Sequence, residues 1–199
     1  MSTIKLFGLW ETGGIKVDDI GLRPYINLRP LFLPKTGGRN TGIMFHKSKT
    51  HIVERLVNKV MVPGHKGKKH KLSSGHCCGK AANRMSIVEE TFKLIETKTK
   101  KNPIEVFVKA IENAAPREEI TTIEYGGARY PKAVECSPQR RVDIALRQFI
   151  QGAYSKSFNS KRKLKETLTD EILKAYNMDQ SSTAIAKKLE LERQADASR

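Results

Sequence analysis

The sequence predicts a mainly helical fold: a bundle of about six helices, a protruding β-hairpin between the third and fourth helices, and an irregular N-terminal extension. Apolar residues recur at helical spacing in six segments after residue 50. Between the third and fourth segments, two runs rich in β-branched and aromatic residues flank a Gly-Gly pair. We therefore divide the chain into an extension at 1–49 and a helical domain at 50–199, with a hairpin arm at about 118–136.

The first 49 residues show no helical period. They contain three prolines and seven glycines, residues that interrupt regular secondary structure. We expect an irregular segment with short strand-like pieces such as Ile4–Leu9.

The first two helices flank a polar loop. Ser48–Thr50 resembles a capping cluster, and the apolar positions that follow it predict a helix that Pro63–Gly64 ends. Residues 64–80 are rich in Lys, His, Gly and Ser and predict a loop. The apolar residues between Met85 and Ile95 then recur on one side of a second helix.

Proline positions mark the start of the next two helices. Asn102–Pro103 supplies a side-chain cap and a proline at the first helical position, and Pro116 ends the third helix. Ser137–Pro138 opens the fourth helix in the same way. Apolar residues at 164–176 predict a fifth helix. Residues 182–197 predict a sixth, charged helix whose end we expect to fray.

The hairpin is expected at Ile120–Tyr125 and Ala128–Cys136. Gly126 and Gly127 accept the positive φ angles that a two-residue hairpin turn requires. Pro131 cannot donate to a neighbouring strand, so one edge of the hairpin stays unpaired. Because an isolated hairpin is marginally stable in water, this arm is best explained by docking onto a partner.

Charge indicates what that partner is. The chain carries 37 Lys and Arg against 21 Asp and Glu, a net charge of +16. Three blocks hold the excess: 1–49 at +5, 64–80 at +5 and 139–165 at +7. Separated basic blocks of this kind favour a surface that binds the backbone of a nucleic acid. An anionic membrane or an acidic protein stays open as an alternative.

The sequence argues against membrane-spanning, secreted and disulfide-rich proteins. No apolar run approaches the roughly 18 residues of a membrane span, and no secretory signal is visible at the start. An odd number of cysteines, three, is a poor disulfide framework and indicates a reducing compartment such as the cytoplasm.

Four segments of the helical domain form a recognisable set. They are KNPIEVFVKAIENAAPREE at 101–119, the Gly-tipped hairpin, ECSPQRRVDIALR at 135–147 and HIVERLVNKVM at 51–61. These segments resemble the universal small-subunit ribosomal protein seven family, and together they cover most of residues 50–195 in the family's order. IKLFGLW near the start and KKLELERQADASR at the end are similar to the archaeal and eukaryotic branch.

The resemblance implies a structural protein of the ribosome without a cofactor, a metal or an enzymatic activity. It implies binding to the 3′ major domain of small-subunit ribosomal RNA and a role in organising the head. Neighbouring head and platform proteins would be partners, and no membrane would be. The hairpin tip, Tyr125, Gly126, Gly127 and Ala128, would lie near the exit-site transfer RNA and the messenger RNA exit path.

Basic residues at one helix start are the leading candidates for RNA contact. Arg140 and Arg141 fall in the first turn of the fourth helix, where free backbone N–H groups favour an anion. Arg147 follows seven residues later on the same side. A solvated surface that includes Asp143 is the alternative. The remaining candidates are Lys47, Lys49, Lys66, Lys68, Lys69, Lys71, Arg117, Arg129, Tyr130, Lys132, Lys156 and Arg162.

Two of these groups have alternative interpretations. On the hairpin, Tyr125 and Tyr130 could stack on unpaired bases or pack across the strands, and Glu124 argues against phosphate contact at the tip. In the loop, five potential zinc ligands lie close together but lack the usual spacing, so we favour RNA contact there. They are His65, His70, His76, Cys77 and Cys78.

An enzyme and a DNA-binding regulator are two alternative function classes for this chain. No nucleophile and base occur together as an enzyme would need, and Cys136 is expected to be a packing residue. A DNA-binding regulator stays open, although charge spread over three blocks and a hairpin does not resemble a single recognition helix.

Overall fold

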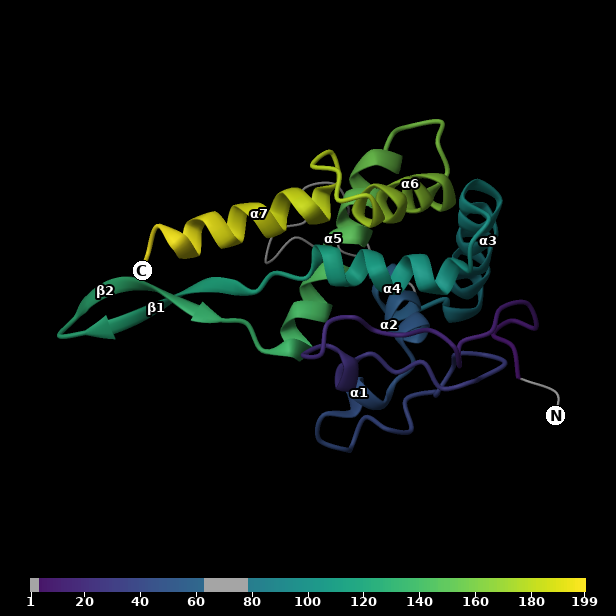
Figure 1. The fold of residues 1–199 in the computed structure, drawn as a ribbon, viewed down its shortest axis with the longest axis horizontal. Helices are drawn as coiled ribbons and strands as arrows, with labels where there is room; N and C mark the ends of the chain where they lie inside the picture. The colour runs from purple at the N-terminus through teal and green to yellow at the C-terminus, as the bar shows by residue number, and fades with distance from the viewer. Residues whose placement is uncertain (1–3, 63–78) are drawn as a thin grey trace.

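The computed structural model describes residues 4–62 and 79–199, and these form seven α-helices and one two-stranded sheet (Figure 1). The strands β1 (Glu118–Tyr125) and β2 (Ala128–Glu135) lie between α4 and α5. The helices are α1 (His46–Lys49), α2 (Ile52–Val60), α3 (Ala81–Thr99), α4 (Pro103–Ala114), α5 (Pro138–Ser157), α6 (Leu164–Tyr176) and α7 (Thr183–Asp196). The six longer helices match the six predicted segments, so the mainly helical fold with a hairpin arm is confirmed.

The two best-defined helix starts differ in how well the sequence predicted them. Asn102 Oδ1 accepts a hydrogen bond from the backbone N–H of Ile104 at 3.0 Å, so the predicted cap of α4 is confirmed. At α2 the predicted Ser48–Thr50 cluster is not the cap. His51 takes this role, and its Nδ1 accepts from the N–H of Val53 at 3.2 Å.

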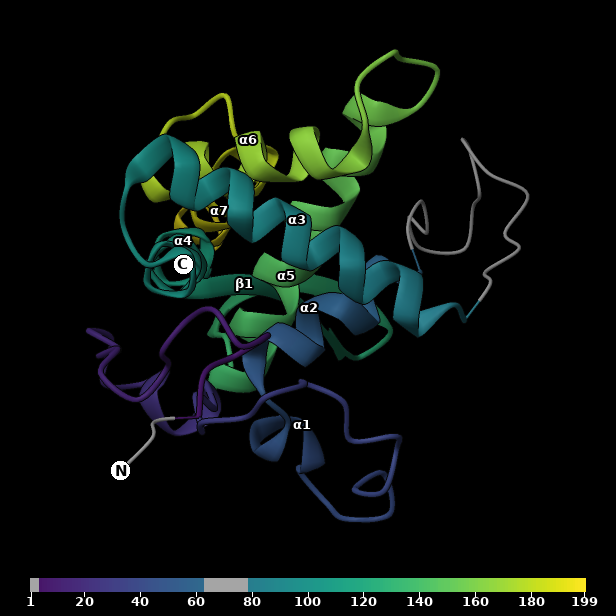
Figure 2. The same cartoon turned by 90° about the vertical axis from the view of Figure 1, so that its right-hand side faces the viewer.

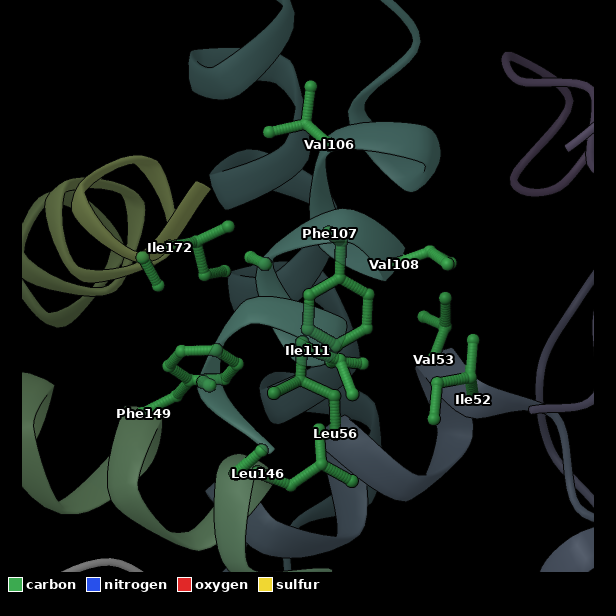
Figure 3. Close-up of a cluster of buried hydrophobic side chains, with 14 of the residues drawn as sticks. Ile52, Val53, Leu56, Val106, Phe107, Val108, Ile111, Leu146, Phe149 and Ile172 are labelled. Atoms are coloured by element: carbon green, nitrogen blue, oxygen red, sulfur yellow. The ribbon is translucent and has the colours of Figure 1, made fainter. Parts of the chain in front are cut away.

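Helix α4 lies at the centre of the core. Phe107 and Ile111 of α4 lie between Leu56 of α2 and Phe149 of α5 (Figure 3). The ring of Phe107 also contacts Phe92 of α3, with 5.7 Å between centroids. Each of these side chains is fully buried, and truncating a buried phenylalanine to alanine costs about 3–5 kcal/mol. Figure 2 looks along α4, with the N-terminal segment on one side and α6 and α7 on the other.

The N-terminal segment is irregular but packs into this core. Leu6, Trp10, Leu22 and Ile26 are at most 5% exposed. Trp10 meets Phe92 of α3 edge to face, with 5.9 Å between ring centroids. Apolar contact with α3 therefore holds the segment on the bundle.

The strand expected at Ile4–Leu9 does not form. Phe7 and Gly8 have positive φ angles of 54° and 74° and turn the chain back. The N–H of Leu6 then donates to the carbonyl of Trp10 at 2.7 Å, as an isolated bridge. This tight turn explains why the apolar residues of this segment do not form an extended strand.

The hairpin has the predicted turn. The strands are antiparallel, with Tyr125 opposite Ala128 and Glu118 opposite Glu135. Between them Gly126 and Gly127 adopt φ angles of 59° and 82°. The arm extends beyond the bundle at the end opposite α3 (Figure 1).

The last helix supports the base of this arm (Figure 1). Arg199 donates to the carboxylate of Glu118 at 2.6 Å, and Glu192 accepts from the backbone N–H of Arg117 at 3.1 Å. Ala195 is fully buried. The expected fraying of this helix end is therefore wrong, because contacts with β1 hold it.

Candidate nucleic-acid interface

One stretch of the chain has positive charges without any acidic residue. Residues 20–53 hold six Lys and Arg side chains and no Asp or Glu. Phe32, Met44 and Phe45 are 59%, 79% and 74% exposed within the same stretch. Basic side chains interleaved with exposed aromatic rings are typical of surfaces that bind single-stranded or folded RNA.

Lys47 and Lys49, two of the predicted RNA-contact residues, lie near the end of this stretch. They differ in whether a carboxylate balances their charge. Lys47 donates to Asp143 of α5 at 2.8 Å. The backbone carbonyl of Lys49 accepts hydrogen bonds from the side chains of Asn27 and Arg29. The ammonium of Lys49 has no ion-pair partner among residues 4–62 and 79–199, which leaves its charge available to a phosphate.

A cluster of four cations surrounds Asp143. Lys47 and Arg55 bond to its carboxylate at 2.8 and 3.3 Å, and Lys59 and Arg147 lie in the same cavity wall. Burial opposes ionisation of Asp143, but the hydrogen bond from Lys47 and the nearby positive charges outweigh burial and lower its pKa. Asp143 is therefore ionised at neutral pH.

The cations of this cluster repel one another. Burial lowers the pKa of Lys59, and the charges of Arg147, Lys47 and Arg55 lower it further, while Asp143 opposes the shift. Arg147 therefore lies with Arg55 and Lys59 of α2 in one cavity wall. It does not pair with Arg140 in a single basic site along α5.

Arg140 and Arg141 occupy different environments at the start of α5. Arg140 is 53% exposed and donates to Glu119 of β1 at 2.7 Å. Arg141 is 12% exposed, and its guanidinium donates to Asp19 at 2.8 Å and to the carbonyl of Pro116 at 3.1 Å. Arg141 therefore joins the hairpin base to the N-terminal segment, and its contact with RNA stays a prediction.

The hairpin presents different residues on its two sides. The pairing register places Tyr125, Tyr130 and Lys132 on one side together with Ile123. Their side chains are exposed, Tyr125 at 82% and Tyr130 at 59%. The two tyrosine rings do not contact any other aromatic ring in the described residues, so they are open to stacking on bases.

The other side of the tip is charged but balanced. Glu124 lies directly opposite Arg129 and pairs with it at 3.5 Å. Both side chains are more than half exposed, so the pair is weak. Arg117 lies at the base of the arm, and its guanidinium forms no ion pair with any of the described residues.

Lys156 and Arg162 both have acidic partners. Lys156 donates to Glu171 at 2.6 Å, and Arg162 pairs with Asp170. Arg162 is 56% exposed and can still reach a second anion. Lys156 is 37% exposed and is held by a carboxylate that is itself fully buried.

The predicted lysine loop lies outside the described residues. Lys66, Lys68, Lys69 and Lys71 fall there, as do the five potential zinc ligands of 65–78. Within 4–62 and 79–199, no group of three or more His, Cys, Asp and Glu is placed to hold a metal ion. In the same residues no helix is long and apolar enough to cross a bilayer.

Cys136 lies buried at the start of α5. Burial and the neighbouring carboxylate of Glu119 raise the pKa of its thiol to about 11. The thiol is therefore protonated at neutral pH and a poor nucleophile. This fits the interpretation of Cys136 as a packing residue.

Sequence reasoning missed Arg55 and Lys59 as members of the basic surface. Both lie in a helix whose sequence pattern is dominated by its apolar positions, and Arg55 is only 5% exposed. A signal did exist, because Arg55 and Lys59 lie four residues apart, and neither has an acidic residue three or four positions away to balance its charge. Their grouping with Arg147 depends on how α2 packs on α5.

Comparisons with known proteins agree on the family. Residues 25–199 match the model for Ribosomal protein S7p/S5e. A protein of Nanoarchaeum equitans named small ribosomal subunit protein uS7 is 54% identical, over 98% of this chain and 99% of its own length.

Two further archaeal relatives carry the same name. The protein of Methanothrix thermoacetophila is 43% identical over 98% of this chain and 100% of its own length. The protein of Archaeoglobus fulgidus is 45% identical over 98% of this chain and 94% of its own length. The resemblance stated from the sequence motifs is confirmed, and the chain belongs to the ribosomal protein S7p/S5e family.

Proposed function

We propose that this protein is a structural constituent of the small ribosomal subunit that binds ribosomal RNA in the cytoplasm. The observation that carries the proposal is the match along 98% of the chain to proteins named as small-subunit components. A net charge of +16, gathered in three separate blocks of the sequence, supports RNA as the partner. Other ribosomal proteins are its expected protein partners.

The finer proposal concerns where it binds. We infer that it recognises the 3′ major domain of the RNA and helps to organise the head, beside head and platform proteins. The hairpin would reach the exit-site transfer RNA and the messenger RNA exit path. An arm whose outer half packs against nothing else in the described chain supports this, since its exposed aromatic side favours an external partner.

The proposed contacts differ in expected strength. Lys49, Arg117, Lys132 and Arg147 have no carboxylate within ion-pair distance in the described residues, so they release the most counterions on binding. Contacts from paired cations must compete with an existing carboxylate. The paired group comprises Lys47, Arg129, Arg140, Arg141, Lys156 and Arg162.

Binding of the whole protein to a 3′ major-domain RNA fragment tests the proposal. The affinity is measured over a salt series, with transfer RNA and duplex DNA as competitors. Ten phosphate contacts predict a log–log slope of about −7 to −9. Binding that survives both competitors supports a shape-specific RNA ligand. Equal displacement by duplex DNA would contradict it and favour a DNA-binding protein.

A further inference from the structure

A cavity of about 700 Å³ opens between α2, α5 and the segment that leads into α1. Five positively charged side chains line it, and only two carboxylates do so among the described residues. The five cations are Lys35, Lys47, Arg55, Lys59 and Arg147. The cavity wall therefore has a net excess of three positive charges, with its histidine counted as neutral.

The two carboxylates do not balance this excess. Glu54 accepts from the backbone N–H and the hydroxyl of Thr36 at 2.8 and 2.6 Å, and it forms no ion pair in the described residues. Asp143 is shared by Lys47 and Arg55. Lys35, Lys59 and Arg147 consequently have no carboxylate within 4.0 Å among residues 4–62 and 79–199.

Part of the excess charge is removed from water. Arg55 is 5% exposed, and its Nε has no hydrogen-bond partner in the structure. Lys59 is partly buried, and desolvation together with Arg147 disfavours its charged form. Like charges gathered in a partly buried site oppose folding unless an anion enters it. The free protein is thus arranged to accept a negative group here.

We propose that this cavity binds one phosphate group of an RNA strand, held chiefly by Lys59 and Arg147. The forked guanidinium of Arg147 can bond two phosphate oxygens at once, and the ammonium of Lys59 supplies a point charge. Lys47 and Arg55 add positive potential from Asp143's side of the cavity. That the phosphate belongs to RNA rests on the proposed function, whereas the anion site follows from the cavity alone.

Thermal unfolding of the full chain at pH 7 in phosphate and in chloride, at equal ionic strength, tests the anion site without RNA. Phosphate is expected to raise the melting temperature by roughly 3 °C or more when it is well above its dissociation constant. Lys59→Met and Arg147→Met should each abolish that increment. Lys59→Met should also raise the melting temperature in chloride, because it removes a repelled, desolvated charge.

A matched control is Lys174→Met on α6, which does not line the cavity and has no ion pair in the described residues. This variant should keep the full phosphate increment. Equal melting temperatures in phosphate and chloride, or an increment that survives in both cavity variants, would overturn the proposal.

RNA binding separates this proposal from the function on which it rests. Each cavity variant should weaken binding to the 3′ major-domain fragment several-fold and reduce the salt slope by about 0.7–0.9. Loss of the phosphate increment with unchanged RNA affinity and slope would overturn RNA as the source of the phosphate. A wild-type protein that shows the increment but does not bind the fragment would contradict the proposed function and leave the anion site supported.

Discussion

The ammonium of Lys156 on α5 lies 2.6 Å from the carboxylate of Glu171 on α6, a residue with no exposed surface. The second carboxylate oxygen of Glu171 accepts from the hydroxyl of Ser182 at 2.9 Å and from the backbone N–H groups of Thr183 and Ala184. One side chain thus pairs α5 with α6 and satisfies the free donors at the start of α7.

Close packing makes this junction intolerant of change. A side chain added at Gly152 of α5 would lie 2.6 Å from the hydroxyl of Thr183, so α5 and α7 touch here only because this position is glycine. The ion pair and the helix start are therefore packed together, and water cannot readily replace a lost hydrogen bond.

We predict that Glu171→Gln destabilises the fold by about 2–4 kcal/mol, because Lys156 loses its counter-charge and the α7 donors lose a charged acceptor. Urea unfolding measures the change. Glu190→Gln, in an exposed i,i+3 pair with Lys187 on α7, is the control and should leave the midpoint unchanged. Equal midpoints for both variants would show that the buried carboxylate does not hold the junction.

Two arginines of α5 are predicted to separate stability from RNA affinity. Arg141→Met should cost about 1.5–3 kcal/mol, because the bonds to Asp19 and Pro116 are lost from a largely buried site. Arg147→Met should not destabilise the fold but should weaken RNA binding. Urea unfolding and RNA titration of both variants check this. If only Arg141→Met weakened RNA binding, Arg141 and not Arg147 would be the RNA-contact residue, which would contradict the prediction.

The elements that the sequence predicted correctly depend on neighbours in the chain. The cap at Asn102–Pro103 and the turn at Gly126–Gly127 are local, because a side chain bonds two residues away or a φ angle needs glycine. Helix α2 shows the limit of such rules, since a histidine rather than the preceding Ser48–Thr50 caps it.

The roles of the charged residues could not be predicted, because their partners lie far away in sequence. Arg141 bonds to Asp19 across 122 residues, and Trp10 donates to Glu96 across 86. Composition and helix position placed Arg141 on a basic surface, but only tertiary packing gives it a structural partner. The same holds for Lys59, whose unbalanced charge appears when α2 packs on α5.

We predict that deleting residues 124–129 leaves the stability of the free protein nearly unchanged. These residues form the exposed tip, and the only ion pair there joins Glu124 to Arg129 in the described chain. Thermal unfolding checks the stability. In reconstituted subunits the head should still assemble, while retention of exit-site transfer RNA should change. Failed head assembly would contradict the proposed separation between bundle and arm.

His51 is predicted to make stability depend on pH. Its side chain is 1% exposed, and burial, with a smaller contribution from the charge of Arg29, lowers its pKa from 6.5 to about 4. The native protein therefore binds fewer protons than the unfolded chain between these values. Stability from this group is complete above pH 6.5 and is lost as the pH falls towards 4.

His51→Asn provides the test, because an asparagine can still accept the hydrogen bond from Val53 at the start of α2 but cannot titrate. When the pH is lowered from 7.5 to 4.5, the free energy of unfolding in urea should fall by up to about 3 kcal/mol more for the wild type than for the variant. The carboxylates whose pKa values are lowered, such as Asp143 and Asp170, act equally in both proteins. Parallel profiles for the two proteins would show that His51 can be protonated without unfolding, and that its neutral ring does not hold the helix start.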